Sequence, residues 1–233
     1  MKLGIMQPYF LPYIGYFQLM NAVDQYVIYD NIQYTKKGWI NRNRILVNGQ
    51  DAYITLPLKH DSDFCCVHER SLADSWPAEK KRLLSRIYNS YRRAPYFVKA
   101  MPVIEAAVNS DKTNLFGFIY DSLLPIREYL NVTTPLITSS TVDIDHSLKA
   151  EEKVIAICKK LYAWEYINAI GGVGLYDRDQ FTSNCIHLHF IKSGEIKYKQ
   201  FDNDFVPSLS IVDVMMFNSQ EQITDMLNNY SLV

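Results

Sequence analysis

The chain has 233 residues, of which 48% are hydrophobic and 21% are charged, and its formal net charge is -1. This is enough apolar material for a sizeable core, so we expect one α/β domain over residues 1–233. No stretch approaches the roughly 20 apolar residues that a membrane span needs, and the amino terminus lacks the pattern of a signal peptide. We therefore expect a cytoplasmic protein without membrane insertion.

The first 30 residues predict a short βαβ unit around which the chain is organised. Residues 2–6 form an apolar run that Gln7-Pro8 stops, residues 13–20 carry apolar side chains at helical spacing, and a second apolar run ends in Asp30. In such units ligands bind beyond the carboxyl ends of the strands, where the next helix presents free N–H groups. We expect residues 7–15 and 30–33 to face one crevice.

The segment after Asp30 is too polar for a core and too aromatic for an ordinary linker. Trp39 can anchor it, while Lys37, Asn41, Arg42 and Arg44 supply donors that suit phosphate or carboxylate oxygens. An ordinary loop with capping asparagines explains the pattern equally well. Asn48-Gly49 then predicts a hairpin between residues 44–47 and 52–58.

Residues 75–130 predict a helical insertion within the domain. Ser75 and Pro77 are typical of a helix start, and residues 102–108 and 115–130 have helical periodicity. No linker-like composition borders this segment. Its basic residues, which gather between positions 80 and 99, suit either an anionic partner such as tRNA or a solvated helix face.

The remaining chain again alternates strands with helices. A strand over 134–138 ends at Ser139-Ser140, a helix follows over 147–162, and a strand over 164–170 runs into Gly171-Gly172. The rest of the chain is predicted to contain a helix over 175–181, a strand over 186–191, an extended piece over 197–201 and a helix over 211–217. This alternation predicts a doubly wound, mainly parallel sheet.

Cysteine and histidine spacing predicts no metal site. Cys65, Cys66, Cys158 and Cys185 have no spacing of a disulfide framework, which agrees with a reducing compartment, and no second Cys or His pair matches Cys65-Cys66. His187 and His189 alternate on a predicted strand and could share a face. They have no evident third ligand, so an ordinary exposed strand face is the better interpretation.

Four segments together resemble the WbqC-like protein family. They are MQPYFLPYIGYFQLMNAVDQYVIYDNIQYTKKGWINRNRI, RIYNSYRRAPYF, YINAIGGVGLYD and FVPSLSIVDVMMFN, and the resemblance runs from residue 1 to 218. Membership implies a bacterial gene cluster for O-antigen or a related surface polysaccharide, and transfer of glycine onto an amino sugar. The family brings no catalytic residues with it.

A second similarity concerns the fold. Adenylate-forming nucleotidyltransferases and class I aminoacyl-tRNA synthetases follow their first strand with a His-x-Gly-His helix start that binds ATP phosphates. This chain has Tyr13-Ile14-Gly15-Tyr16 at the corresponding place. Gly15 keeps close approach of a ligand possible, but phenols cannot act as cationic donors at neutral pH. We expect that architecture without its ATP chemistry.

Our functional hypothesis is that the protein is an enzyme that transfers an aminoacyl group to the amine of a nucleotide-linked sugar. Asp30 is the candidate acid or base, and Gln7, Asn41 or the Gly171-Gly172 amides are candidate donors to an oxyanion. The cofactor is unknown: the donor is glycyl-tRNA, a thioester, or free glycine with ATP. The candidate substrate-binding residues are Pro8, Tyr9, Tyr13, Gly15, Tyr16, Gln33, Lys37, Trp39, Arg42, Arg44, Ser139, Ser140, Asn168, Gly171, Gly172, Tyr198 and Gln200.

Two other functions stay open. Nucleotidyl or adenylyl transfer fits the similar fold, and the absence of both histidines argues against it. A non-catalytic protein that binds sugar nucleotides fits the aromatic residues near the first loop, since these rings stack on a sugar or a base. The oligomeric state is not predicted by any feature of the sequence.

Overall fold

The computed structural model describes residues 1–233 and has a six-stranded central sheet. Its strand order is β5-β2-β1-β6-β7-β8, in which the first five strands run parallel and β8 runs antiparallel to β7. The α/β class with a mainly parallel sheet is thus confirmed. The strands are β1 (Lys2–Met6), β2 (Gln25–Ile28), β5 (Leu136–Thr138), β6 (Glu165–Ala169), β7 (His187–Ser193) and β8 (Tyr230–Leu232).

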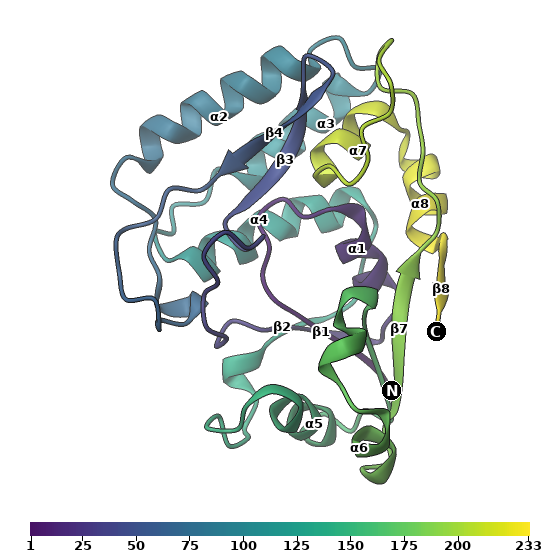
Figure 1. The fold of residues 1–233 in the computed structure, drawn as a ribbon. Coiled ribbons are helices and arrows are strands. Elements are labelled where there is room, and N and C mark those ends of the chain that lie inside the picture. The colour runs from purple at the N-terminus through teal and green to yellow at the C-terminus, as the bar shows by residue number, and fades with distance from the viewer.

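Helices cover both faces of this sheet, as Figure 1 shows. Side chains alternate along a strand, so β2 sends Tyr26 and Ile28 to the larger hydrophobic cluster and Val27 to the smaller one. The smaller cluster lies against α5 (Ala150–Lys160) and α6 (Arg178–Ser183). The larger cluster includes residues of α1 (Ile14–Asn21) and of each element inserted between β2 and β5.

The insertion consists of a hairpin, a 3-10 turn and three helices. The hairpin, β3 (Arg42–Val47) and β4 (Gln50–Thr55), forms where Asn48-Gly49 predicts it, with both turn residues at positive φ. Figure 1 shows it beside α2. The other elements are η1 (Val67–Glu69), α2 (Trp76–Tyr91), α3 (Phe97–Ala107) and α4 (Leu115–Tyr129).

Two predicted helix starts are wrong. The second insertion helix begins at Phe97 and not at residue 102, because Pro102 lies on the exposed face, where the carbonyl that loses its partner can be hydrated. The helix expected over 175–181 is divided into the 3-10 segment η3 (Ile170–Leu175) and α6. Asp177 accepts from the amide of Asp179 at 3.0 Å and thereby caps α6.

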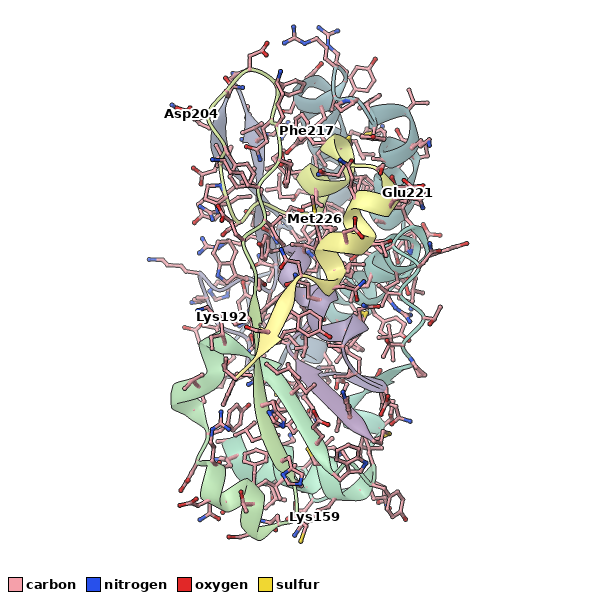
Figure 2. All side chains as sticks on the ribbon, turned by 90° about the vertical axis from the view of Figure 1, so that its right-hand side faces the viewer. Lys159, Lys192, Asp204, Phe217, Glu221 and Met226 are labelled. Carbon is pink, nitrogen blue, oxygen red and sulfur yellow. The ribbon has the colours of Figure 1, made fainter.

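The end of the chain also differs from expectation. Residues 197–201 form no strand, and β8 takes the sheet edge beside β7. Figure 2 shows β8 next to β7 and the long loop that carries Asp204 far from the sheet. Two helices, α7 (Ile211–Phe217) and α8 (Gln220–Asn228), precede this strand. No helix has the length and apolar character required to cross a membrane.

Candidate functional site

The strand order places a topological switch point between β1 and β6. From β1 the chain crosses to β2 on one side, and the later strands β6 and β7 lie on the other. Ligands of open α/β sheets bind at such points, outside the carboxyl ends of the strands. A crevice of about 370 Å³ lies there, and we call it the switch-point crevice. It is lined by Met6, Tyr9, Pro12, Tyr13, Gly15, Tyr16, Trp39, Asn43, Arg44, Ala169, Ile170, Ile191, Ser193 and Ser208.

The first βα turn forms one wall of this crevice. Tyr9, Tyr13, Gly15 and Tyr16, which are candidate substrate-binding residues, all line it. Tyr16 is otherwise a core residue, and burial raises the pKa of its phenol, which therefore stays neutral. Gly15 sits in the first turn of α1, where a Cβ atom would lie 3.2 Å from the Ser193 hydroxyl. Close approach of the backbone to its surroundings thus explains this glycine.

The hairpin supplies the cationic part of the crevice. Trp39 stacks on Tyr53 with ring centroids 6.3 Å apart, and the guanidinium of Arg44 lies 5.6 Å from the Trp39 centroid. Arg44 pairs with Asp51 at 3.0 Å, while its buried Nε has no hydrogen-bond partner. Arg42 turns its donors to the main-chain oxygens of Lys37 and Gly38. Arg44 is therefore the cation that faces the crevice.

A polar cluster gathers at the end of β2. Asp30 is 2% exposed, and its Oδ1 accepts from the Ser139 hydroxyl at 2.8 Å and from the Ser140 amide at 2.9 Å. His68 lies on the other side, with Nδ1 3.1 Å from the main-chain oxygen of Asp30 and 3.9 Å from its Oδ2. We call Asp30, His68, Ser139 and Ser140 the Asp30 cluster. The structure thus brings together three predicted residues and one that was not predicted.

A second hollow, of about 680 Å³, opens next to the Asp30 cluster, and we call it the α5 hollow. Tyr29, Asn31 and Gln33 line one side, and the start of α5 lines the other. Lys153 is 5% exposed there, and burial lowers the pKa of its ammonium. The α5 hollow is lined by Tyr29, Asn31, Ile32, Gln33, His146, Ser147, Leu148, Lys149, Ala150, Glu151, Lys153, Val154, Leu175 and Tyr176.

The glycine-containing segment η3 separates the two spaces. Its first residue, Ile170, lines the switch-point crevice, and its last, Leu175, lines the α5 hollow. Gly172 packs so closely on Asn168 that an added Cβ would lie 2.4 Å from the side-chain nitrogen, whereas Gly171 has no neighbour within 4 Å. The Oδ1 of Asn168 accepts from the amide of Ala169 at 2.8 Å. Asn168 and Gly172 therefore hold the shape of η3.

Several predicted residues are committed to the protein itself or lie outside both spaces. Asn41 accepts from the Tyr34 hydroxyl and donates to the oxygen of Leu56, each at 2.9 Å. Gln33 donates to the main-chain oxygen of Asp63 at 2.9 Å. Gln7, Pro8, Lys37 and Arg42 line neither the crevice nor the α5 hollow. Their functional roles stay predictions.

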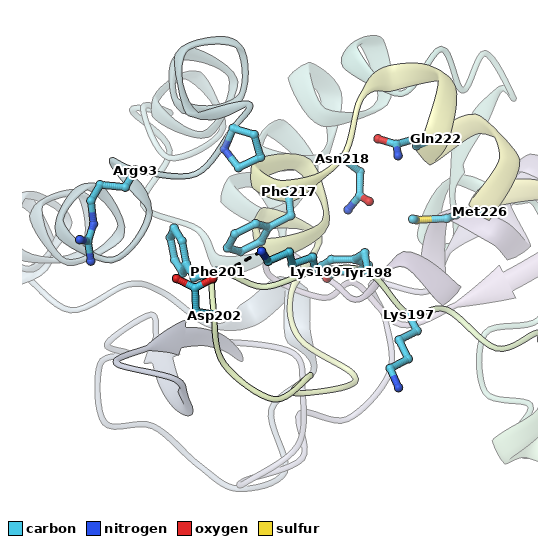
Figure 3. A pocket seen from close by; sticks show the side chains of 11 residues that line it. Arg93, Lys197, Tyr198, Lys199, Phe201, Asp202, Phe217, Asn218, Gln222 and Met226 are labelled. Atoms are coloured by element: carbon cyan, nitrogen blue, oxygen red, sulfur yellow. Dashed lines mark ion pairs between the residues drawn. The ribbon is translucent and has the colours of Figure 1, made fainter.

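Tyr198 and Gln200 lie away from the switch point. Both donate to Oδ2 of the buried Asp213, at 2.7 and 2.6 Å. Tyr198 also lines a separate hollow of about 580 Å³ beside α7 and α8, drawn in Figure 3 with the Lys199–Asp202 ion pair at its rim. Neither residue lines the switch-point crevice or the α5 hollow, and their roles in binding stay predictions.

The sequence reasoning missed His68, Lys153 and Asp213. His68 was considered only as a metal ligand, Lys153 lies in an ordinary amphipathic helix, and Asp213 looks like a solvated acid. No group of three or more His, Cys, Asp or Glu residues could hold a metal ion. On β7, His187 is exposed, and His189 lies 3.9 Å from a carboxylate oxygen of Glu165.

The fold and these spaces define an α/β protein with a crevice at the switch point of a mainly parallel sheet. The chain belongs to the WbqC-like protein family, whose sequence model matches residues 7–225. It is also 29% identical to the uncharacterized protein Rv1507c of Mycobacterium tuberculosis over 228 aligned residues. The alignment covers 97% of each of the two chains. No solved structure matches the chain.

Proposed function

We propose that the protein is a transferase that adds an aminoacyl group, glycyl, to the amine of a nucleotide-linked amino sugar in surface polysaccharide (O-antigen) synthesis. One observation carries the proposal: two spaces open at the carboxyl edge of the sheet, on either side of η3, and the Asp30 cluster lies next to one of them. A transferase must hold two substrates close together in a fixed orientation. Glycine and the amino sugar come from the family resemblance.

The switch-point crevice suits the nucleotide-linked sugar. Tyr9, Tyr13 and Trp39 offer ring faces for stacking on a base or sugar. The guanidinium of Arg44 lines the crevice and matches the geometry of phosphate oxygens, for which it would exchange its contacts with Asp51 and the main-chain oxygen of Ser208. Gly15 lies in the first turn of α1 and lines the crevice, and the start of a helix favours a negatively charged group such as a phosphate.

The α5 hollow suits the anionic carrier of the glycyl group. The Lys153 ammonium is nearly buried, and its one hydrogen bond is a long contact of 3.4 Å to the main-chain oxygen of His146. Buried charges in proteins are normally paired, so this ammonium favours an anionic ligand group. Phosphates of glycyl-tRNA and of a coenzyme A thioester both meet this requirement, as does ATP with free glycine.

A second candidate function is nucleotidyl transfer. The strand order β5-β2-β1-β6-β7 favours it, because nucleotide-binding sheets with their ligand at the first βα turn have the same order. Exchange of pyrophosphate into ATP in the presence of glycine is the measurement that separates this reaction from direct acyl transfer. A non-catalytic protein would bind the sugar nucleotide and give neither exchange nor product.

The proposal is tested by incubating the protein with a panel of nucleotide-linked amino sugars and each glycine donor. We expect one pair to give a product heavier by one glycyl residue in mass spectrometry. In that reaction Trp39→Ala and Arg44→Ala should each raise KM for the sugar nucleotide at least tenfold.

The matched control is Arg82→Ala, which removes an exposed ion pair with Glu79 on α2, away from both spaces. It should leave KM unchanged. If no donor and acceptor pair reacts, or if the control weakens binding as much as Arg44→Ala does, the proposal is wrong.

A further inference from the structure

We infer that His68 is the general base of the Asp30 cluster and that Asp30 is its positioning residue. This inference rests on the proposed function, because it names the group that takes the proton from the attacking amine. Sequence reasoning assigned that task to Asp30 itself. The geometry of the cluster favours the imidazole.

The carboxylate of Asp30 is closed to substrate. The residue is 2% exposed, and its Oδ1 already accepts from the Ser139 hydroxyl and the Ser140 amide. A group that takes a proton must come within hydrogen-bond reach of it. The imidazole of His68, with a side chain that is 39% exposed, is the basic group of the cluster that solvent can reach, and it lies beside the α5 hollow without lining it.

The main chain holds His68 firmly at this place. Its amide donates to the oxygen of Asp30 at 3.2 Å, and its own carbonyl accepts from the Asn114 side chain at 2.6 Å. The preceding Val67 amide donates to Ile32 at 2.9 Å. Because both sides of η1 are tied down, the ring keeps its edge against the end of β2.

The contacts of the ring select one tautomer. Nδ1 lies 3.1 Å from the main-chain oxygen of Asp30, and a carbonyl oxygen only accepts hydrogen bonds. Nδ1 must therefore carry the hydrogen, and in the neutral ring the lone pair is on Nε2. No protein group contacts Nε2 within hydrogen-bond distance. A free basic nitrogen at the carboxyl edge of the sheet is what a general base requires.

Charged groups surround the ring. Oδ2 of Asp30 lies 3.9 Å from Nδ1. Glu69, the next residue, is turned away and accepts from the Cys66 amide at 2.6 Å. Lys153 approaches the cluster from α5, where Asp30 and Cys66 act on its pKa.

The reaction then balances as follows. Nε2 of His68 takes one proton from the sugar ammonium, and the neutral amine attacks the carbonyl carbon of an activated glycyl ester or thioester. A C–N bond forms and the C–O or C–S bond of the carrier breaks. As the intermediate collapses, the nitrogen loses a further proton to water, and the protonated imidazole gives its proton to the leaving oxygen or sulfur.

The tautomer is tested without any substrate by 15N NMR of the full-length protein at a pH where the ring is neutral. We expect His68 to show the Nδ1–H tautomer, whereas the exposed His187 should show the Nε2–H form that free imidazole side chains prefer. In Asp30→Asn the main-chain contact persists and so should the tautomer. An Nε2–H tautomer at His68 in the wild type overturns the inference.

Kinetics test the role. With the donor and acceptor pair found above, His68→Gln should lower kcat at least about 100-fold with KM within threefold, and His187→Gln should change neither. Asp30→Asn, or Ser139→Ala if that variant does not fold, should lower kcat about tenfold and leave KM unchanged. Wild-type kcat in His68→Gln overturns the inference while the transferase stands. If no pair reacts, the proposed function fails and the base role fails with it, whatever the tautomer.

Discussion

The buried Asp213 offers a sharp test of how the insertion is joined to the end of the chain. Its Oδ1 accepts from the hydroxyl of Tyr91 on α2 at 2.8 Å, and the same hydroxyl accepts from the main-chain amide of Leu46 on β3 at 2.7 Å. One phenol thus links α2, β3 and α7. Tyr91→Phe removes this oxygen and leaves the ring in place.

The expected cost follows from these contacts. The variant leaves the buried Leu46 amide without a partner, which costs about 1–3 kcal/mol, and removes a hydrogen bond to a buried carboxylate, which contributes about 1.5–3 kcal/mol. Because Tyr198 and Gln200 still donate to Asp213, we expect a total near the lower end, about 3 kcal/mol. For a chain of this length that lowers Tm by roughly 6–12 °C.

Urea denaturation at neutral pH, followed by circular dichroism, measures this loss. Tyr198→Phe removes one hydrogen bond to Asp213 and leaves no main-chain amide without a partner, so it should lower the free energy of unfolding by about 1–2 kcal/mol. The control is Tyr88→Phe on the same helix, where the side chain is 48% exposed and the change should stay within about 0.5 kcal/mol. Equal losses in Tyr91→Phe and Tyr198→Phe would refute the assigned role of the Leu46 contact.

Three further predictions concern the crevice, the thiols and pH. Gly15→Ala should weaken binding of a nucleotide-linked sugar at least tenfold in calorimetry, because its Cβ meets the Ser193 hydroxyl, whereas Gly174→Ala, with no atom within 4 Å, should not. Burial raises the pKa of the Cys158 thiol to about 12, so a disulfide reagent should modify the exposed Cys185 at once and Cys158 only on unfolding; fast modification of Cys158 in the native protein would contradict its burial. Burial also raises the pKa of the Asp213 carboxyl in the folded protein above its value in the unfolded chain. The stability that this carboxyl contributes is therefore complete at pH below its unfolded-state pKa, and it is lost as the pH rises through the folded-state pKa. Asp213→Asn should therefore cost more stability at pH 4 than at pH 7, and an equal cost would contradict that direction.

Local patterns were sufficient for much of the fold. The apolar run at residues 2–6, the helix after Pro12 and the Asn48-Gly49 turn are each defined by neighbours in sequence, and each forms as expected. Alternation of strands with helices was likewise enough for a mainly parallel sheet. Prediction failed at the end of the chain, where residues 197–201 form no strand and the unpredicted β8 pairs with β7.

The candidate site was likewise predicted only in part from the sequence. The sequence by itself predicted one crevice for residues 7–15 and 30–33, because the end of a strand and the start of the next helix must lie together. The structure instead places residues of the first segment in the switch-point crevice and residues of the second in the α5 hollow. The sequence also placed Asp30 at the end of its strand. The resemblance of four segments to the WbqC-like protein family is confirmed by the family model, which matches residues 7–225.

Only the tertiary structure decided which side chains Asp30 and Asp213 contact. Asp30 meets His68, 38 positions away, and Ser139, 109 positions away, while Asp213 meets Tyr91 at a separation of 122. Such partners share no period or motif, because their proximity comes from how strands and helices pack. A buried carboxylate needs donors from whichever elements surround it, and the chain's linear order does not name those elements.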